Sequence, residues 1–365
     1  MDNSGVSMKI AIFSLKGLGD TLMQIPLIRA LNRAHPGSGI TVLVPDGACA
    51  DIFKNCPYVR AVTIAYRQPG PELAAAVMKL LYFLRAEKFD ASITAFPSNR
   101  VWYNLLAAWT GAPKRITHSY PRAALRTLSF LQNCRVAADP ARHELENNLN
   151  LLSCLGLDPG AEKDLSPWLS PEDGQYAENF LAAHGLNDGS PVVGLHPAIN
   201  PRQIYKAWGT GNAEVFAGLT DWLASAFGAK VILFSGPDEK EAAADTLRLT
   251  GTRPAVCEGA TINQTAALIK KCRLFINTDS GLGHLAASVR TPAVTVFGPA
   301  NPGMTSPYGA ANKIIAPSAE CAPCYDYPYG STYPRLKCSA PECLKRIDLN
   351  ALKETVSEAM KEPRP

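Results

Sequence analysis

The sequence predicts an α/β protein built from two doubly wound halves, and three observations support this fold class. Short apolar runs alternate with helical patterns in two separate series, the first beginning at Lys9 and the second at Val192. Glycine-rich or polar turns follow the apolar runs, as expected where parallel strands lead into helices. The chain of 365 residues is also longer than a single hydrophobic core usually supports.

The first series opens with an apolar strand that leads through a glycine turn into a helical pattern. Its predicted strands are 9–14, 40–44, 59–64 and 89–94, and its predicted helices are 21–33, 71–87 and 99–109. Beyond Pro113 the alternation loosens, and the helical patterns at 144–155 and 171–184 are separated by proline- and glycine-rich breaks. The later part of 140–191 is interpreted as the connection between two domains.

The second series is more regular than the first. Its predicted strands are 192–195, 230–234, 274–276 and 293–297, and its predicted helices are 212–227, 238–249 and 262–271. An amphipathic tail at 348–361 carries Leu349, Leu352, Val356 and Met360 at helical spacing. We therefore expect one domain at residues 1–185, a second at 186–345 and a C-terminal helix at 346–365.

The composition is typical of a soluble globular protein, with 47% hydrophobic and 19% charged residues. The formal net charge of +4 is modest and gives no reason to expect a nucleic-acid partner. The first residues lack the basic and apolar regions of a signal peptide, which favours the cytoplasm and leaves a peripheral membrane contact open. The ten cysteines are mostly scattered, as expected for reduced thiols.

A polar octet, Asn277–His284, lies between a predicted strand and a predicted helix. Helix N-termini present free N–H groups and suit a phosphate group. Two further predicted strands end in polar residues, at His196 and at 235–239, and parallel strands bring such ends to one edge of a sheet. A loop before Trp208 carries Lys206, which can reach a phosphate as a point charge. Together these features predict a diphosphate site.

Asp20 follows the first predicted strand, in the turn Gly17-Leu18-Gly19-Asp20. The turn is not a dinucleotide fingerprint, because position 22 is Leu where the third glycine would stand. The position alone favours a helix N-cap, which would stabilise the helix by about 1 kcal/mol. The alternative is a carboxylate exposed in a substrate cleft.

The span from Ala91 to Ala138 contains no Asp or Glu. Its basic residues are Arg100, Lys114, Arg115, Arg122, Arg126 and Arg135. The span is either a solvated basic surface or a groove for an anionic partner, and the uninterrupted absence of acids favours the groove.

Several kinds of catalytic chemistry have no motif in this chain. The Gly-x-Ser-x-Gly elbow of hydrolases, the Walker A sequence and paired Asp-x-Asp metal ligands are all absent. A reaction that uses a nucleotide diphosphate would therefore stabilise the leaving group with protein cations and helix N–H groups.

The chain resembles glycosyltransferase family 9, which contains the ADP-heptose:lipopolysaccharide heptosyltransferases. The resemblance runs from about Met8 to the C-terminus. Its motifs are Leu18-Gly19-Asp20 with Gln24-x-Pro26, Lys206-x-Trp208, Gly236-Pro237-x-Glu239, and Asp279-Ser280-Gly281-x-x-His284-x-Ala286 with Val296-Phe297-Gly298-Pro299. It implies a GT-B fold, in which two Rossmann-like domains face each other across a cleft. The N-terminal domain would bind the acceptor and the C-terminal domain the sugar nucleotide, with inverting transfer that needs no metal.

The resemblance also implies roles for individual residues. Asp20 would be the general base, which replaces the N-cap interpretation. Lys206 would neutralise the diphosphate, Glu239 would hold the ribose or base, and His284 is either a ligand contact or a structural helix residue. The remaining donor contacts would be Thr278, Asp279, Ser280 and Gly281. The anionic, lipid-linked acceptor and the membrane face would be bound by Lys114, Arg115, Arg122 and Arg126.

Four cysteines fall in one tyrosine- and proline-rich stretch, namely Cys321, Cys324, Cys338 and Cys343. Four thiolates at this spacing can hold a structural zinc or iron ion, and some members of the resembled family have a cysteine-bound iron. The alternative is four reduced thiols in a surface loop.

Three functions remain open at this stage. The first is a heptosyltransferase that builds the lipopolysaccharide core from ADP-heptose. The second is an enzyme of the same family with a protein or another glycan as acceptor. The third is a nucleotide-sugar binder or epimerase on the same fold, against which Asp20 in its motif argues.

Overall fold

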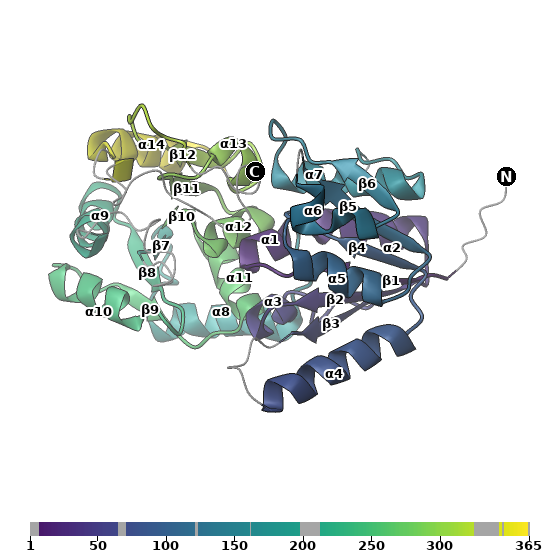
Figure 1. Cartoon of the computed structure of the whole chain (residues 1–365). Helices are drawn as coiled ribbons and strands as arrows, with labels where there is room; N and C mark the ends of the chain where they lie inside the picture. The colour runs from purple at the N-terminus through teal and green to yellow at the C-terminus, as the bar shows by residue number, and fades with distance from the viewer. Residues whose placement is uncertain are drawn as a thin grey trace. The chain divides into compact units, whose positions relative to one another are not determined.

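Two parallel β-sheets flanked by helices organise the chain (Figure 1). The computed structural model describes residues 7–64, 71–120, 123–160, 162–197, 212–324, 343–344 and 347–363. The described residues up to Trp168 form one compact unit, and those from Leu169 form a second. No helix in these ranges is both long and apolar enough to cross a bilayer.

The sheet of the first unit has the strand order β3-β2-β1-β4-β5-β6, and neighbouring strands run parallel. Its central strands are buried on both faces, which explains why they read as apolar runs in the sequence. The strands are β1 (Lys9–Phe13), β2 (Gly39–Val44), β3 (Val59–Thr63), β4 (Ala91–Thr94), β5 (Lys114–Ser119) and β6 (Cys134–Ala137).

The helices of the first unit connect these strands. They are α1 (Leu18–Leu22), α2 (Ile25–Ala34), α3 (Gly47–Asp51), α4 (Pro71–Ala86), α5 (Val101–Trp109), α6 (Ala124–Thr127), the 3₁₀ turn η1 (Ser129–Leu131), α7 (Glu144–Asn150) and the 3₁₀ turn η2 (Leu151–Leu155). Leu84 of α4 and Tyr103 of α5 share one apolar cluster with Phe13 of β1. Both helices therefore cover the same face of the sheet.

The second unit repeats this topology. Its sheet has the order β12-β11-β10-β7-β8-β9, again with parallel neighbours. Its strands are β7 (Val192–His196), β8 (Lys230–Phe234), β9 (Ala255–Cys257), β10 (Leu274–Thr278), β11 (Ala293–Val296) and β12 (Lys313–Ile315). Its helices are α8 (Pro171–Ala183), α9 (Asn212–Phe227), α10 (Lys240–Leu249), α11 (Ile262–Lys271), α12 (Gly281–Ser288), α13 (Pro302–Thr305) and α14 (Leu349–Lys361).

The longer predicted elements are confirmed, including α9, β8 and α11 at the bounds expected from the sequence. The single helix expected over 21–33 is wrong, because the chain forms α1 and then α2. Pro26 lacks an N–H group and lies in the first turn of α2, where that group has no partner in the helix. The short strands β5, β6, β9 and β12 were not predicted.

The two units divide at a different place from the expected boundary at 185/186. α8 belongs to the second unit, where it packs against α11 with its buried Ala177 and Leu181. The C-terminal helix α14 also joins the second unit, since Leu352 and Val356 lie in the core cluster beneath the sheet. Neither helix forms a separate body.

One expectation about the cysteines is corrected. The elements β6 and η2 pack against each other, and Cys134 of β6 forms a disulfide with Cys154 of η2. The prediction of reduced thiols agrees with the structure at Cys49, Cys257 and Cys272, which are free and buried. Spacing could not reveal the pair, because β6 itself was not predicted.

Candidate functional site

The carboxyl edge of the second sheet contains a topological switch point between β7 and β10. These strands are neighbours in the sheet. After β7 the chain adds β8 and β9 on one side, and after β10 it adds β11 and β12 on the other side. Open α/β sheets bind ligands at this position. The register pairs Asn277 with His196, so the end of β7 lies beside the start of the polar octet. The predicted convergence of these strand ends is therefore present.

His196 joins the two polar loops of this edge. Its Nε2 lies 2.9 Å from Oε2 of Glu239, and its Nδ1 lies 3.0 Å from Oγ of Ser280. A carboxylate can only accept, so Nε2 carries the proton and donates to Glu239. In the neutral ring Nδ1 then accepts, and the Ser280 hydroxyl donates to it. One buried imidazole thus fixes residues from two separate loops.

Glu239 precedes α10 and is mostly buried. Burial raises the pKa of this carboxyl, but the hydrogen bond and charge of His196, together with the Gly236 N–H, lower the pKa below its ordinary value. The Gly236 N–H donates to Oε2 at 2.8 Å. A Cβ atom at Gly236 would lie 2.9 Å from the same oxygen, so a side chain there would displace the carboxylate. The hydrogen bonds from His196 and from the Gly236 N–H thus both go to Oε2 of Glu239.

Ser280 is the N-cap residue of α12, yet its side chain makes no cap bond to the helix. Its hydroxyl is held by His196 instead. The first N–H groups of α12 are therefore not covered by the residue that normally satisfies them. This leaves the helix N-terminus available to an anion such as a phosphate.

α12 begins close to the strand that precedes it. Asn277 is fully buried, and its side chain accepts a hydrogen bond from Thr295 of β11 and donates to the Thr278 carbonyl. A Cβ atom at Gly283 would overlap the Asn277 amide. Glycine at this position permits the close approach of helix and strand, as in other Rossmann-like turns.

The other predicted donor residues lie around this turn. Thr278, Asp279 and His284 are buried, whereas Ser280 and Gly281 are partly exposed. The structure therefore brings all five together with Glu239, and it adds His196. Lys206 lies outside the described residues.

The first sheet has its own switch point between β1 and β4, and Asp20 follows β1 there. Asp20 is the third residue of α1 and not its N-cap, which is Gly17. Its Oδ2 accepts from the Gly17 N–H at 3.2 Å, and its Oδ1 lies 3.8 Å from Nζ of Lys16. The side chain is still 24% exposed. The carboxylate is thus oriented by its own turn and remains accessible.

The residues before and after Asp20 anchor this turn. The Thr21 hydroxyl donates to the Gly17 carbonyl at 3.0 Å and is also hydrogen-bonded to Ser14 of the preceding strand end. The Gln24 amide donates to the Asp20 carbonyl at 3.1 Å. These bonds hold the backbone that carries the Asp20 side chain.

The predicted acceptor residues do not gather in one place. Lys114 and Arg115 open β5, at the amino edge of the sheet, whereas Asp20 lies at the carboxyl edge. The guanidinium of Arg115 donates to the carbonyls of Leu131 and Ala112, at 3.2 and 2.9 Å. Arg126 is exposed in α6, which follows the carboxyl end of β5. Arg122 lies outside the described residues.

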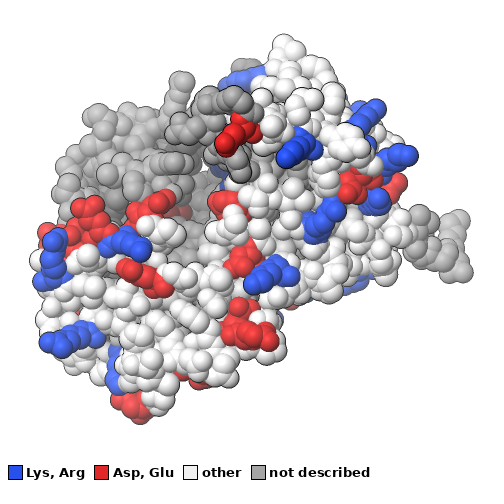
Figure 2. Space-filling view, turned by 90° about the horizontal axis from the view of Figure 1, so that it is seen from below, with Lys and Arg blue, Asp and Glu red and all other residues white. Residues whose placement is uncertain are grey.

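Charged residues of both signs are interspersed over the face shown in Figure 2. The surface ion pairs of the described residues include Arg60 with Glu87 and Lys230 with Asp188. Such exposed pairs contribute little to stability.

The cysteine stretch is only partly described, because Cys338 lies outside the described residues. Cys324 and Cys343 are buried and Cys321 is exposed. Among the residues that the structure describes, no group of three His, Cys, Asp or Glu side chains is placed to hold a metal ion.

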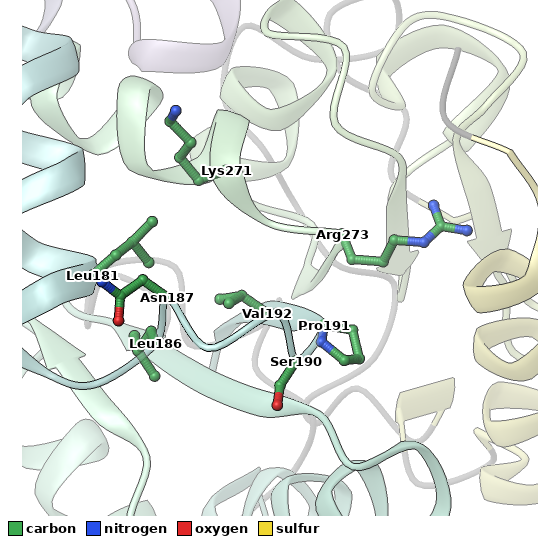
Figure 3. A pocket seen from close by; sticks show the side chains of 9 residues that line it. Leu181, Leu186, Asn187, Ser190, Pro191, Val192, Lys271 and Arg273 are labelled. Carbon is green, nitrogen blue, oxygen red and sulfur yellow. The ribbon is translucent and has the colours of Figure 1, made fainter.

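An open pocket of about 460 Å³ lies at the other edge of the second sheet (Figure 3). It is lined by Leu181 of α8 and Leu186 after it, by Val192 at the start of β7, and by Lys271 at the end of α11 with Arg273 before β10. Arg273 donates to the carbonyls of Met360 and Glu362 at the end of α14. This pocket is separated from the candidate site by the length of β7.

His196 is the site residue whose role the sequence did not assign. A histidine at the end of a buried strand is unusual, so the sequence did contain a signal for this residue. The position at a strand end does not, however, show which residues the histidine contacts. Its partners, Glu239 and Ser280, lie 43 and 84 residues away along the chain.

The two parallel-sheet units, each with helices on its sheet, define a class of protein. They are those of the GT-B fold, as the sequence predicted. The chain belongs to glycosyltransferase family 9 (heptosyltransferase), whose family model matches residues 77–331.

Known proteins resemble the chain over most of its length. Lipopolysaccharide heptosyltransferase 3 of Escherichia coli is 28% identical over 288 residues, which are 77% of this chain and 80% of that protein. The structure of a family 9 glycosyl transferase from Veillonella parvula covers 98% of both chains, with a TM-score of 0.77 and 23% identity. E. coli heptosyltransferase WaaC with ADP gives a TM-score of 0.71 at 22% identity and covers 96% of this chain and 100% of that chain.

Proposed function

We propose that this glycosyltransferase transfers a heptose from ADP-heptose to the inner core of lipopolysaccharide. The observation that carries the proposal is the uncapped N-terminus of α12, with Ser280 held aside by His196 at the switch point of the second sheet. A diphosphate suits this site. The relatives named as lipopolysaccharide heptosyltransferases, and the related structure with ADP, support this choice of donor and acceptor.

The donor is bound by the second unit in this proposal. The N–H groups at the start of α12 receive the diphosphate, with Lys206 as its counter-charge. Glu239 accepts a ribose hydroxyl through Oε1, while His196 and Gly236 hold Oε2. Asp279 accepts hydrogen bonds from the sugar hydroxyls, because a carboxylate beside the phosphate groups would be repelled by their negative charge.

The first unit supplies the base. The acceptor hydroxyl attacks the anomeric carbon, ADP leaves with the electron pair of the broken bond, and Asp20 takes the proton of the hydroxyl. Attack opposite the leaving group inverts the anomeric configuration. The charge that develops on ADP is stabilised by helix N–H groups and lysine, so the proposed reaction needs no metal.

The acceptor is an anionic, lipid-linked glycan, and the enzyme works against the cytoplasmic face of the inner membrane. Arg126, on the carboxyl side of β5, is better placed for an acceptor at Asp20 than Lys114 or Arg115. The acid-free span supports an anionic partner.

The test replaces Asp20 by Asn, which keeps the shape of the side chain and removes the base. We expect kcat for transfer from ADP-heptose to a core-truncated lipopolysaccharide to fall roughly 10²–10⁴-fold. ADP affinity, measured by titration calorimetry, should stay the same. Asp173→Asn is the matched control, because Asp173 accepts from the Ser170 N–H in α8 as Asp20 does from Gly17 in α1. Turnover that survives in Asp20→Asn would reject Asp20 as the base.

A further inference from the structure

Large apolar side chains project into solvent from one face of the first unit. Met78 and Tyr82 of α4 are 65% and 78% exposed, and Leu125 of α6 is 82% exposed. Leu105 and Trp109 of α5 are each about half exposed. We name these residues the α4–α6 face. Protein surfaces with contiguous exposed apolar groups usually mark an interaction site.

Helix geometry shows that these residues are surplus to the core. Leu105 and Trp109 are four residues apart and share one stripe of α5, whereas Tyr103 and Ala107 are buried against the sheet. In α4 the inward stripe contains Leu84, while Met78 and Tyr82 point outward. Each helix is therefore apolar on both its inner and its outer side, which folding alone does not require.

The helices of this face are fixed to one another. The indole N–H of Trp109 donates to the Leu81 carbonyl at 2.8 Å and so joins α5 to α4. The guanidinium of Arg85 lies against Gly111, just past the end of α5. α5 also contacts α6 and η1, and α4, α5 and α6 follow one another upward in Figure 1. The exposed side chains thus lie on helices that are packed together and form one continuous surface.

Most charges around this face are basic, with Glu72 in the first turn of α4 as an exposed acid. Residues 91–138, which include α5, α6 and η1, contain no acid. Arg126 is exposed directly beside Leu125, and Lys79 is exposed beside Met78. The carboxylate of Glu87, past the end of α4, is engaged by Lys9 and Arg60. Exposed apolar groups with basic neighbours match the interfacial region of an anionic bilayer.

We propose that the α4–α6 face docks on an anionic lipid bilayer, with Met78, Tyr82 and Leu125 entering the headgroup region. A second copy of the chain fits this face less well, because self-pairing would oppose basic side chains with no acid from residues 91–138 to neutralise them. The inference deepens the peripheral membrane contact included in the proposed function. It names the surface that makes this contact.

The experiment measures cosedimentation of the full-length protein with vesicles. Vesicles of phosphatidylethanolamine with phosphatidylglycerol are compared with vesicles of phosphatidylcholine alone, at low and high salt. The test variants are the double variant Met78→Ser/Tyr82→Ser, the single variant Leu125→Ser and the charge variant Arg126→Glu. The matched controls are Leu249→Ser in α10, where the leucine is 51% exposed, and Lys54→Glu.

We expect the wild type to bind the anionic vesicles, to bind neutral ones far more weakly, and to dissociate as salt rises. The double variant should lose about tenfold in partition coefficient, which corresponds to about 1.4 kcal/mol. Leu125→Ser and Arg126→Glu should each lose severalfold, and both controls should bind as the wild type does. ADP titration of each variant checks that the donor site is intact.

Two results would overturn the inference. One is a wild-type protein that does not bind anionic vesicles. This result includes the case in which light scattering shows that the wild type is a dimer and that the Met78→Ser/Tyr82→Ser variant is not. The other is equal losses in the test variants and the controls. Vesicle binding without transfer from ADP-heptose would reject the proposed donor or acceptor and leave the docking surface standing.

Discussion

The role of His196 can be tested by replacing it with Phe, which retains a planar ring and removes both hydrogen bonds. Ser280 would then be free to rotate and cap α12, covering the N–H groups proposed to bind phosphate. An N-cap serine stabilises its helix by about 1 kcal/mol, and the ligand would have to displace it. Loss of the bond that orients Glu239 costs about another 1 kcal/mol. ADP affinity should therefore fall roughly 30-fold.

A double-mutant cycle separates these two contributions. In a Ser280→Ala background no hydroxyl can cap the helix, so His196→Phe should cost only about 1 kcal/mol, the part assigned to Glu239. Titration calorimetry with ADP measures all four proteins, and His184→Ala is the control for loss of a histidine elsewhere in the second unit. Effects that add within about 0.3–0.5 kcal/mol would refute the coupling of His196 to the cap.

Three further predictions concern stability and metal content. Burial lowers the pKa of His118 to about 4, although its hydrogen bond to the Asn147 carbonyl acts in the opposite direction. The unfolded chain therefore takes up a proton at this histidine at a higher pH than the folded protein does. The free energy of unfolding should fall by up to about 3 kcal/mol as the pH drops from about 6.5 to 4, and chemical denaturation should show a flatter pH dependence in His118→Gln. Gly283→Ala should destabilise the protein by about 1–3 kcal/mol through overlap with Asn277, whereas Gly218→Ala in α9, where a Cβ meets open space, should not; equal melting temperatures for the two variants would contradict this. If the cysteines of 321–343 hold a metal, elemental analysis of protein purified without chelators should find about one zinc or iron per chain, and a metal-free, fully active protein would exclude it.

The sequence predicted the elements that carry their own local signal. α9, β8 and α11 have long apolar periods between clear breaks, so their bounds followed directly. β5 did not, because Lys114–Ser119 has a single aliphatic residue and its polar side chains are buried through partners elsewhere in the chain. Short strands such as β9 obtain their structure from a neighbouring strand and not from their own pattern.

The predicted acceptor set shows the limit of reasoning from composition. Lys114, Arg115 and Arg126 were grouped because they lie in one acid-free span. A strand of six residues separates its first residues from the loop that follows it, so β5 carries Lys114 and Arg115 to one edge of the sheet and leaves Arg126 beyond the other. Sequence proximity could not show this, because β5 was not predicted.

The sequence by itself determined the α/β class, the two doubly wound halves, the family and the polar turn that precedes α12. These depend on periodicity and on strand–turn–helix motifs, which are local properties of the chain. Only the tertiary structure decided that Asp20 is the third residue of α1, that α8 belongs to the second unit, and that His196 restrains Glu239 and Ser280. Strand order and parallel register create these contacts between residues far apart in sequence, and no local pattern encodes them.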